Sequence, residues 1–268
     1  MGRVGETVRQ AQRPKIMSDM QKLMGEVAKR CPGGVLPRDY LVIDLETSGL
    51  NWNPPAFTRP DVIVQVGYAA IKDGKLVSNN AHYLRRPVGT MKPEAERVTR
   101  ITDGMLQQMG EPPVEFYNRF LKLLNLYAKN KCMLVGHNIL SFDMPFLTSE
   151  LGRSGINLEY PASSIIDTGC LFKAVQIGSM PGSTETLEMY LGRIRNTRSR
   201  VKWRLDYAIS VLDLDREYGL DLEAAHDAGY DCYMTHILFE KLRVCDAGDA
   251  FERLKNERAS KNKQGQAD

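Results

Sequence analysis

Two carboxylates stand directly after an apolar run in the segment YLVIDLETSGL, residues 40–50. In a β-strand, residues two apart point to the same side, so Asp44 and Glu46 project together from the end of the strand. Carboxylates this close repel one another, and a divalent cation that prefers oxygen ligands, such as Mg²⁺ or Mn²⁺, relieves that repulsion. The alternative is a strand that simply leaves the core for solvent, so further acids in similar settings are needed to favour a metal site.

Three more residues stand in comparable settings later in the chain. In LVGHNILSFDMPFL, we expect a strand to end at Gly136 and a helix to begin near Ser141, which places Asp143 in its first turn. An acid that only stabilises a helix start is the alternative for Asp143. In EAAHDAGYDCYMTHILFEKL, we expect one long helix on which His226 and Asp231 lie about 140° apart around the axis. Such a histidine suits proton transfer beside a metal ligand.

The elements that must position these side chains follow two patterns. A strand over residues 40–46 precedes DVIVQVGYAAIKDGKLVSNNAHYLRRP, which predicts a hairpin that turns at Asp73 and Gly74. Helical and strand patterns then alternate. The expected ranges are helices over 93–108 and 113–129, a strand over 132–136, a helix from about 142, a strand over 164–167 and helices to about 243. The order predicts an α/β fold with a mixed five-stranded sheet flanked by helices.

In their order and spacing, the acids and the histidine resemble the DEDDh (DnaQ-like) 3′–5′ exonuclease family, which has the ribonuclease H-like fold. The segments ETSGL, GHNILSFD, RVTRITDGML and SIIDTGCLF also resemble elements of this family, and the resemblance covers about residues 39–242. The residues that match its catalytic set are Asp44, Glu46, Asp143, His226 and Asp231. The tyrosine subclass carries Tyr four residues before the last Asp, where this chain has Asp227, so the histidine subclass is the better match.

The resemblance implies hydrolysis assisted by two metal ions. The four carboxylates would hold two Mg²⁺ or Mn²⁺ ions, and His226 would take the proton of a bound water. The resulting hydroxide would attack the last phosphodiester and release a nucleoside 5′-monophosphate from the 3′ end.

The resemblance also implies a pocket for the 3′ end of a nucleic acid. Thr47 and Ser48 would lie near the terminal sugar hydroxyl, Leu50 would wedge against the terminal base, and Phe142 would offer a stacking face. For Leu50 and Phe142, packing in the core is the alternative.

A basic stretch, GRIRNTRSRVKWR, is a second candidate for substrate contact. Arg198 and Arg200 would follow a phosphate backbone, and Trp203 would stack on a base. A solvated loop is the alternative, but the stretch precedes a catalytic segment in an otherwise nearly neutral chain.

Other residues beside these motifs are expected to be structural. His137 and Asn138 would support a loop at a strand end, and Asp167 would begin a helix. The chain departs from the family at Gln65, where many members have Glu, and in a longer loop, NWNPPAFTRP. Neither departure is expected to touch the ligands, but the loop adjoins the substrate site.

Composition sets the remaining expectations. The 268 residues include 36 Lys and Arg and 33 Asp and Glu, so the net charge of +3 leaves nucleic-acid binding to a local basic patch. Five scattered cysteines favour reduced thiols and a cytoplasmic location, and no apolar run approaches the roughly 18 residues of a membrane span. We expect an accessory helix and linker over 1–38, the exonuclease domain over 39–245, and a charged, disordered tail over 246–268.

Several functions compete for this sequence. Proofreading or trimming of DNA, as by the polymerase III epsilon subunit, competes with trimming of RNA, as by RNase T or oligoribonuclease. We prefer single-stranded DNA 3′ ends, because extensions at both ends could tether the chain to a polymerase or another replication protein. A catalytically silent nucleic-acid-binding scaffold and an unrelated Mg²⁺ hydrolase of small phosphates are the alternatives from other classes.

Overall fold

The computed structural model describes residues 16, 18–158 and 160–244. The predicted tail over 246–268 and the first part of the predicted N-terminal segment lie outside the described residues. In the described part of the chain, no helix is long and apolar enough to cross a membrane.

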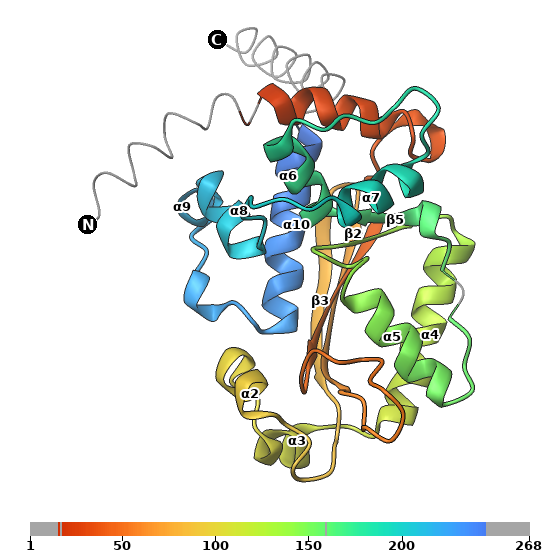
Figure 1. Ribbon diagram of the computed structural model, residues 1–268, viewed down its shortest axis with the longest axis vertical. Coiled ribbons are helices and arrows are strands. Elements are labelled where there is room, and N and C mark those ends of the chain that lie inside the picture. Colours follow the sequence, from red (N-terminus) through yellow and green to blue (C-terminus); the bar gives the residue numbers. More distant parts are fainter. Residues whose placement is uncertain (1–15, 17, 159, 245–268) are drawn as a thin grey trace, which may run out of the picture.

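One mixed sheet of five strands forms the centre of the molecule, in the order β3-β2-β1-β4-β5 (Figure 1). The strands are β1 (Tyr40–Thr47), β2 (Ile63–Lys72), β3 (Lys75–Tyr83), β4 (Met133–Gly136) and β5 (Ile165–Asp167). The β1-β2 and β2-β3 pairs are antiparallel, whereas β1-β4 and β4-β5 are parallel. Asp73 and Gly74 both have positive φ, which suits the tight turn of the hairpin. The predicted fold class and hairpin are confirmed.

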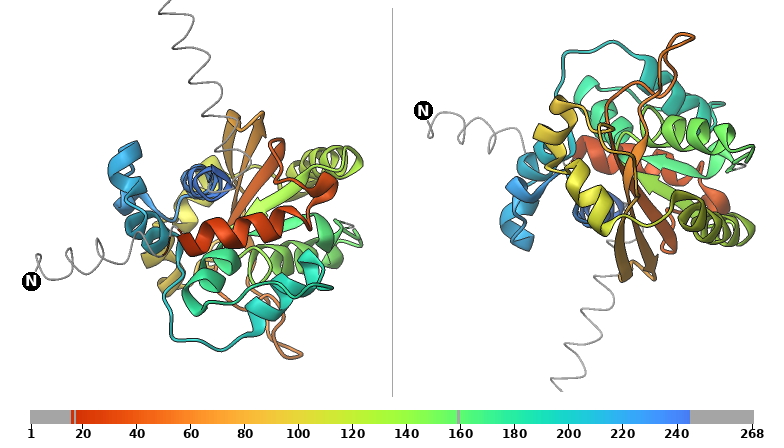
Figure 2. Two further views of the ribbon diagram at one scale, coloured as in Figure 1. Left: turned by 90° about the horizontal axis from the view of Figure 1, so that it is seen from above. Right: turned by 90° about the horizontal axis from the view of Figure 1, so that it is seen from below.

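Helices cover both faces of the twisted sheet (Figure 2). On one face, α4 and α5 pack on the sheet, and on the other face α10 packs with α6, α7 and α8. The helices are α2 (Pro93–Thr99), α3 (Asp103–Met109), α4 (Pro113–Lys129), α5 (Asp143–Arg153), α6 (Thr168–Ile177), α7 (Leu187–Asn196), α8 (Leu205–Val211), α9 (Leu214–Tyr218) and α10 (Ala228–Val244).

Strand β1 divides its side chains between the two faces. Leu41, Ile43 and Leu45 are buried under α4 and α5, whereas Tyr40 and Val42 belong to the core under α10. Because side chains alternate along a strand, the next two residues of the second series are the acids at 44 and 46. The alternation of β1 therefore directs both acids to the α10 face.

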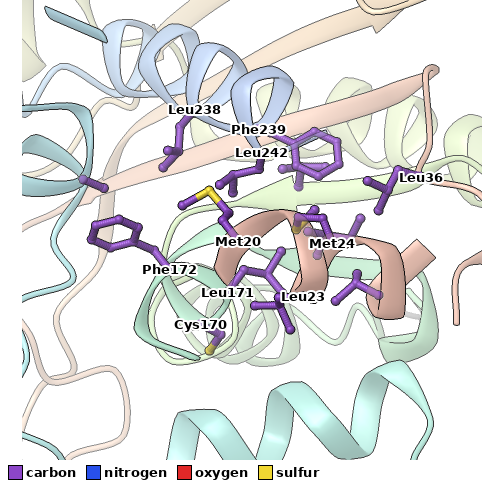
Figure 3. Close-up of a cluster of buried hydrophobic side chains, with 14 of the residues drawn as sticks. Met20, Leu23, Met24, Leu36, Cys170, Leu171, Phe172, Leu238, Phe239 and Leu242 are labelled. Atoms are coloured by element: carbon purple, nitrogen blue, oxygen red, sulfur yellow. The ribbon is translucent and has the colours of Figure 1, made fainter. Parts of the chain in front are cut away.

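A helix over residues 18–28 packs into the same core as α10. Figure 3 shows its Met20, Leu23 and Met24 against side chains of α6 and α10. The three side chains are essentially inaccessible to solvent. This helix is therefore integrated into the main core of the described structure.

Two predicted helix boundaries are wrong. The expected helix over 93–108 is interrupted: Arg100 adopts a left-handed conformation with φ 60°, and the Thr102 side chain accepts a hydrogen bond from Met105 N to begin α3. The expected helix containing His226 begins only at Ala228, because His226 also has a positive φ, 71°, which a right-handed helix excludes.

Candidate active site

A cleft of about 490 Å³ opens at the end of β1. Its walls come from the end of β1, the start of α5, the segment that enters α10, and α2 with the residue before it. The cleft therefore brings together segments that are far apart in the sequence, and all five predicted catalytic residues line it. These are Asp44, Glu46, Asp143, His226 and Asp231.

Each acid reaches the cleft from a regular element. Asp44 and Glu46 belong to β1, Asp143 is the first residue of α5, and Asp231 lies in the first turn of α10. Glu46, His226 and Asp231 each present a ligand atom within 4.8 Å of the others. Rigid elements hold ligands more precisely than loops do, so the cleft is suited to a defined coordination geometry.

Burial and mutual repulsion raise the pKa values of these acids. Burial is the main cause at Asp44, followed by the charges of Asp231 and Asp143, and it raises the pKa of Asp44 well above its usual range. Burial likewise raises the pKa of Glu46 well above its usual range, that of Asp143 to about 8 and that of Asp231 to about 7. Without a positive charge among them, the four groups are held together at an electrostatic cost.

One buried oxygen among these acids lacks a hydrogen-bond partner in the part of the chain that the structure describes. Asp143 is 1% exposed, and its Oδ1 has no hydrogen-bond partner within the described structure. None of the four carboxylates forms an ion pair with a described Lys or Arg. A set of oxygen donors with an unsatisfied buried oxygen fits a hard divalent cation. The four acids are therefore a candidate cation site.

His226 lies at the entrance of α10 and not on the helix. Its backbone N–H points at the carboxylate of Asp231, with N to Oδ distances of 3.3 and 3.4 Å. The helical angle predicted between these residues is therefore wrong, although both line the cleft. Burial lowers the pKa of His226, and the charge of Arg204 lowers it further. A neutral imidazole can accept a proton.

The structure brings three of the four predicted pocket residues to the cleft. Thr47, Leu50 and Phe142 line it. Leu50 is 82% exposed, so core packing does not explain it, whereas Phe142 also packs on Phe146 with ring centroids 4.9 Å apart. Ser48 is buried, and its Oγ accepts a hydrogen bond from Val62 N outside the cleft.

The basic stretch runs beside the cleft without lining it. Arg198 and Arg200 are exposed and have no ion-pair partner among the described residues. Trp203 is half-buried, packs against the core, and lines with Arg204 an adjoining pocket of about 200 Å³. Lys173 Nζ lies 5.9 Å from the centre of the Trp203 ring. The structure therefore separates the two arginines, which face solvent, from a tryptophan that is held in place.

The residues expected to be structural make structural contacts. The Asp167 side chain accepts hydrogen bonds from the backbone N–H groups of Cys170, Asn138 and Leu140. It therefore caps α6 and holds the loop that leads to α5. His137 is bound between Thr168 Oγ1, at 3.0 Å, and the carbonyl of Trp203, at 2.7 Å.

Sequence reasoning missed the wall of the cleft opposite the acids. Helix α2, drawn in yellow below the lower end of α10 in Figure 1, contributes Arg97 and Val98 to the lining of the cleft. Lys92, the residue before α2, also lines the cleft. No side chain of α2 is buried. Lys92 is fixed by an ion pair with the buried Asp61, at 2.7 Å. Ala95 packs partly against a small core cluster, whereas Arg97 and Val98 are exposed. No signal in the local sequence indicates that this short helix borders the cleft.

Comparisons with known proteins agree with this geometry. A family model described as exonuclease, of the RNase T type, matches residues 41–239. The chain is 28% identical over 207 residues to the PolC-type DNA polymerase III of Staphylococcus saprophyticus, which covers 76% of this chain. It is 27% identical over 158 residues to the DNA polymerase III epsilon subunit of Pasteurella multocida, which covers 59% of this chain.

Solved structures give the same fold. Exonuclease I of E. coli, in complex with a dA16 oligonucleotide, superposes with a TM-score of 0.56 at 21% identity and covers 83% of this chain. The chain spans only part of these relatives: 11% of the PolC-type polymerase, 58% of the epsilon subunit and 44% of the Exonuclease I chain.

Proposed function

The chain belongs to the DnaQ-like exonuclease family, and on that premise we propose that it removes nucleotides from 3′ ends of single-stranded nucleic acid. The observation that carries the proposal is the group of four carboxylates, three of them buried and none paired with a described Lys or Arg, beside a histidine whose pKa is lowered by burial. A module that only bound nucleic acid would be weakened by this group, because uncompensated acids repel phosphate.

The residues fit two Mg²⁺ or Mn²⁺ ions, with Asp44, Glu46, Asp143 and Asp231 as the ligands. When bound, such ions lower the pKa of a coordinated water and offset the charge of the scissile phosphate. Elements β1, α5 and α10 contribute these carboxylates from different directions, so the protein fixes where the reacting phosphate can lie.

His226 acts as the proton acceptor in this proposal. Burial lowers the pKa of His226 and so favours the neutral imidazole, in which a ring nitrogen can take the proton of the attacking water. Its left-handed backbone conformation turns it out of α10, and Asp231 accepts its backbone N–H. The histidine is therefore oriented by the same acid that completes the cation site.

The remaining cleft residues bind the end of the strand. Leu50 presents an exposed side chain that can pack on the terminal base, and Phe142 lines the same cleft and can offer its ring for stacking. Arg97 of α2, which also lines the cleft, can offset phosphate charge.

DNA is the proposed preferred substrate, and a polymerase or another replication protein is the proposed partner. The relatives named DNA polymerase III, at 27–28% identity, support both proposals. Trimming of RNA ends remains the competing function within the family. A cytoplasmic location, with the replication machinery, belongs to the same proposal.

The test is a gel time course on matched single-stranded DNA and RNA, each labelled at the 5′ end, with Mg²⁺, with Mn²⁺ or with EDTA. We expect a metal-dependent ladder that shortens from the 3′ end, faster on DNA. An Asp44→Asn preparation, purified identically, controls for contaminating nucleases. Binding of both strands without shortening would favour the silent scaffold, and a faster RNA ladder would reverse the proposed sugar preference.

A further inference from the structure

Gln65 is a buried polar residue next to the cleft that has no place in the chemistry described so far. It lies in β2 directly opposite Glu46 and is 1% exposed. Residues directly opposite in a sheet share a face, so Gln65 points to the α10 side. Its side chain does not line the cleft. Any effect of Gln65 on the reaction must therefore pass through its neighbours.

Both ends of the Gln65 amide are bound to the entrance of α10. Its Nε2 donates to Asp227 Oδ2 at 2.8 Å, and its Oε1 accepts from the backbone N–H of Ala228 at 3.0 Å. These two residues lie between His226 and Asp231. The amide therefore joins β2 to the segment that connects the proton acceptor to the last acid.

Asp227 in turn accepts two hydrogen bonds from the first turn of α10. Its Oδ1 accepts from the backbone N–H of Tyr230 at 3.0 Å, and its carbonyl accepts from the backbone N–H of Asp231 at 2.8 Å. Asp227 therefore caps α10 with one carboxylate oxygen while the other receives Gln65. It also begins the helix directly after the left-handed His226.

The sheet is shaped to receive this first turn of α10. A Cβ on Gly67 would lie 2.1 Å from the carbonyl oxygen of Ala228, so only glycine permits the contact. Asn79 of β3 donates to the carbonyl of Gly229 at 2.9 Å. The start of α10 is therefore seated on two strands, and Gln65 is its hydrogen-bonded connection nearest to Glu46.

We propose that Gln65 is a positioning residue that, through Asp227, fixes where His226 and Asp231 stand relative to Glu46; the proposal rests on the exonuclease function above. The contact between Gln65 and Asp227 requires one hydrogen-bond donor and one acceptor. Glutamate at 65 has no donor for Asp227 and would place two carboxylates at hydrogen-bond distance. Asparagine at 227 would face Gln65 with a second donor while its oxygen caps the helix. The two changes together restore one donor and one acceptor across the contact.

The experiment compares Gln65→Glu, Asp227→Asn and the double variant with the unmodified chain. We expect each single variant to lower kcat on the order of 10- to 100-fold with KM changed less than about threefold, as for residues that orient a metal ligand. The double variant should return kcat to within a few-fold of the original value. Hydrogen exchange in EDTA should show faster exchange of the amides of 228–231 in the singles and recovery in the double.

Glu150→Gln is the matched control, because it alters a buried carboxylate that does not contact α10. It should lower the melting temperature while exchange at 228–231 and kcat stay unchanged. Equal loss of kcat in the double variant and the singles, or unchanged exchange in the singles, would overturn the positioning role. If the unmodified chain shortens neither DNA nor RNA, the proposed function fails, while the exchange measurement still decides the role of Gln65.

Discussion

Helix α5 buries two carboxylates in opposite circumstances. Glu150 is 6% exposed, and it accepts hydrogen bonds from Ile63 N at 2.8 Å and Tyr117 OH at 2.7 Å and pairs with Arg86. Asp143, the first residue of α5 and about two turns before Glu150, is equally buried but has an oxygen without a partner within the described structure. Buried charge is tolerated where it is paired. Glu150 finds its hydrogen-bond partners and counter-charge within the protein, whereas Asp143 has one oxygen for which the described structure provides no partner.

The largest expected effect is on activity, at Asp143. Asp143→Asn should abolish cleavage, because an amide is a poorer cation ligand than a carboxylate. In EDTA, the variant should unfold at a higher temperature than the original chain, since it removes a carboxyl group whose ionised form is disfavoured by burial. Gel assays and thermal unfolding measure the two outcomes. A loss of activity accompanied by a lower melting temperature would show that Asp143 is structural.

The second effect is at His226. Replacement by alanine should lower kcat by about 10²- to 10⁴-fold, the usual contribution of a general base, with little change in melting temperature. Full activity of His226→Ala would assign proton transfer to another group. Restoration by added imidazole would support the role assigned here.

The third effect is on stability, at Glu150. Glu150→Gln should lower the free energy of unfolding by about 3 kcal/mol, because it leaves the partly buried Arg86 without its counter-charge. Cleavage at a temperature well below the transition should persist. Denaturant titration measures the change. A stability equal to that of the original chain would contradict the stabilising role assigned to Glu150 in contrast to Asp143.

The pH dependence of stability should reveal the raised pKa values of the acids in the cleft. Without divalent cations, the folded pKa is about 8 for Asp143 and about 7 for Asp231, against an unfolded value of about 3.9. The stability that these groups contribute is complete below about pH 4 and is lost as pH rises towards 8. In EDTA, the melting temperature should fall between pH 5 and 8, and Mg²⁺ should raise it more at pH 8. A flat profile would contradict the raised pKa values.

The smallest expected effect lies in the basic stretch. Arg198→Ala combined with Arg200→Ala should weaken DNA binding a few-fold and flatten its salt dependence, because each phosphate contact releases counterions. Arg193→Ala is the control: that arginine is already paired with Glu185, so the salt slope should hold. Unchanged binding by the double variant at every salt concentration would exclude the stretch from the substrate path.

The acids were predictable from the sequence because strand and helix ends carry local signals. The alternation of β1 and the apolar run before Asp143 were enough to place three of the acids on elements that meet. The entrance of α10 was not predictable in the same way. Helical spacing continues through His226, and only the capping by Asp227 and the contact with Gln65 show where the helix begins.

Two further differences from the expected structure depend on the folded backbone. The hydroxyl of Ser48 is committed to Val62, fourteen residues away, so its motif position alone did not reveal its direction. The break at Arg100 depends on a left-handed residue that few sequence patterns announce. Local patterns therefore identified the reacting groups, while the contacts that aim them required the folded chain.

Helix α2 has a consequence for how the molecule can change. None of its side chains is fully buried, and only Ala95 packs partly against a core cluster. Substitutions at its exposed positions should therefore cost little folding free energy, although several residues of α2 border the cleft. The cation site, by contrast, is built from residues of the sheet and its packed helices. Residues of α2 that border the cleft can therefore be changed without altering the residues of the cation site. This makes α2 a suitable segment to randomise when selecting variants that accept different 3′ ends.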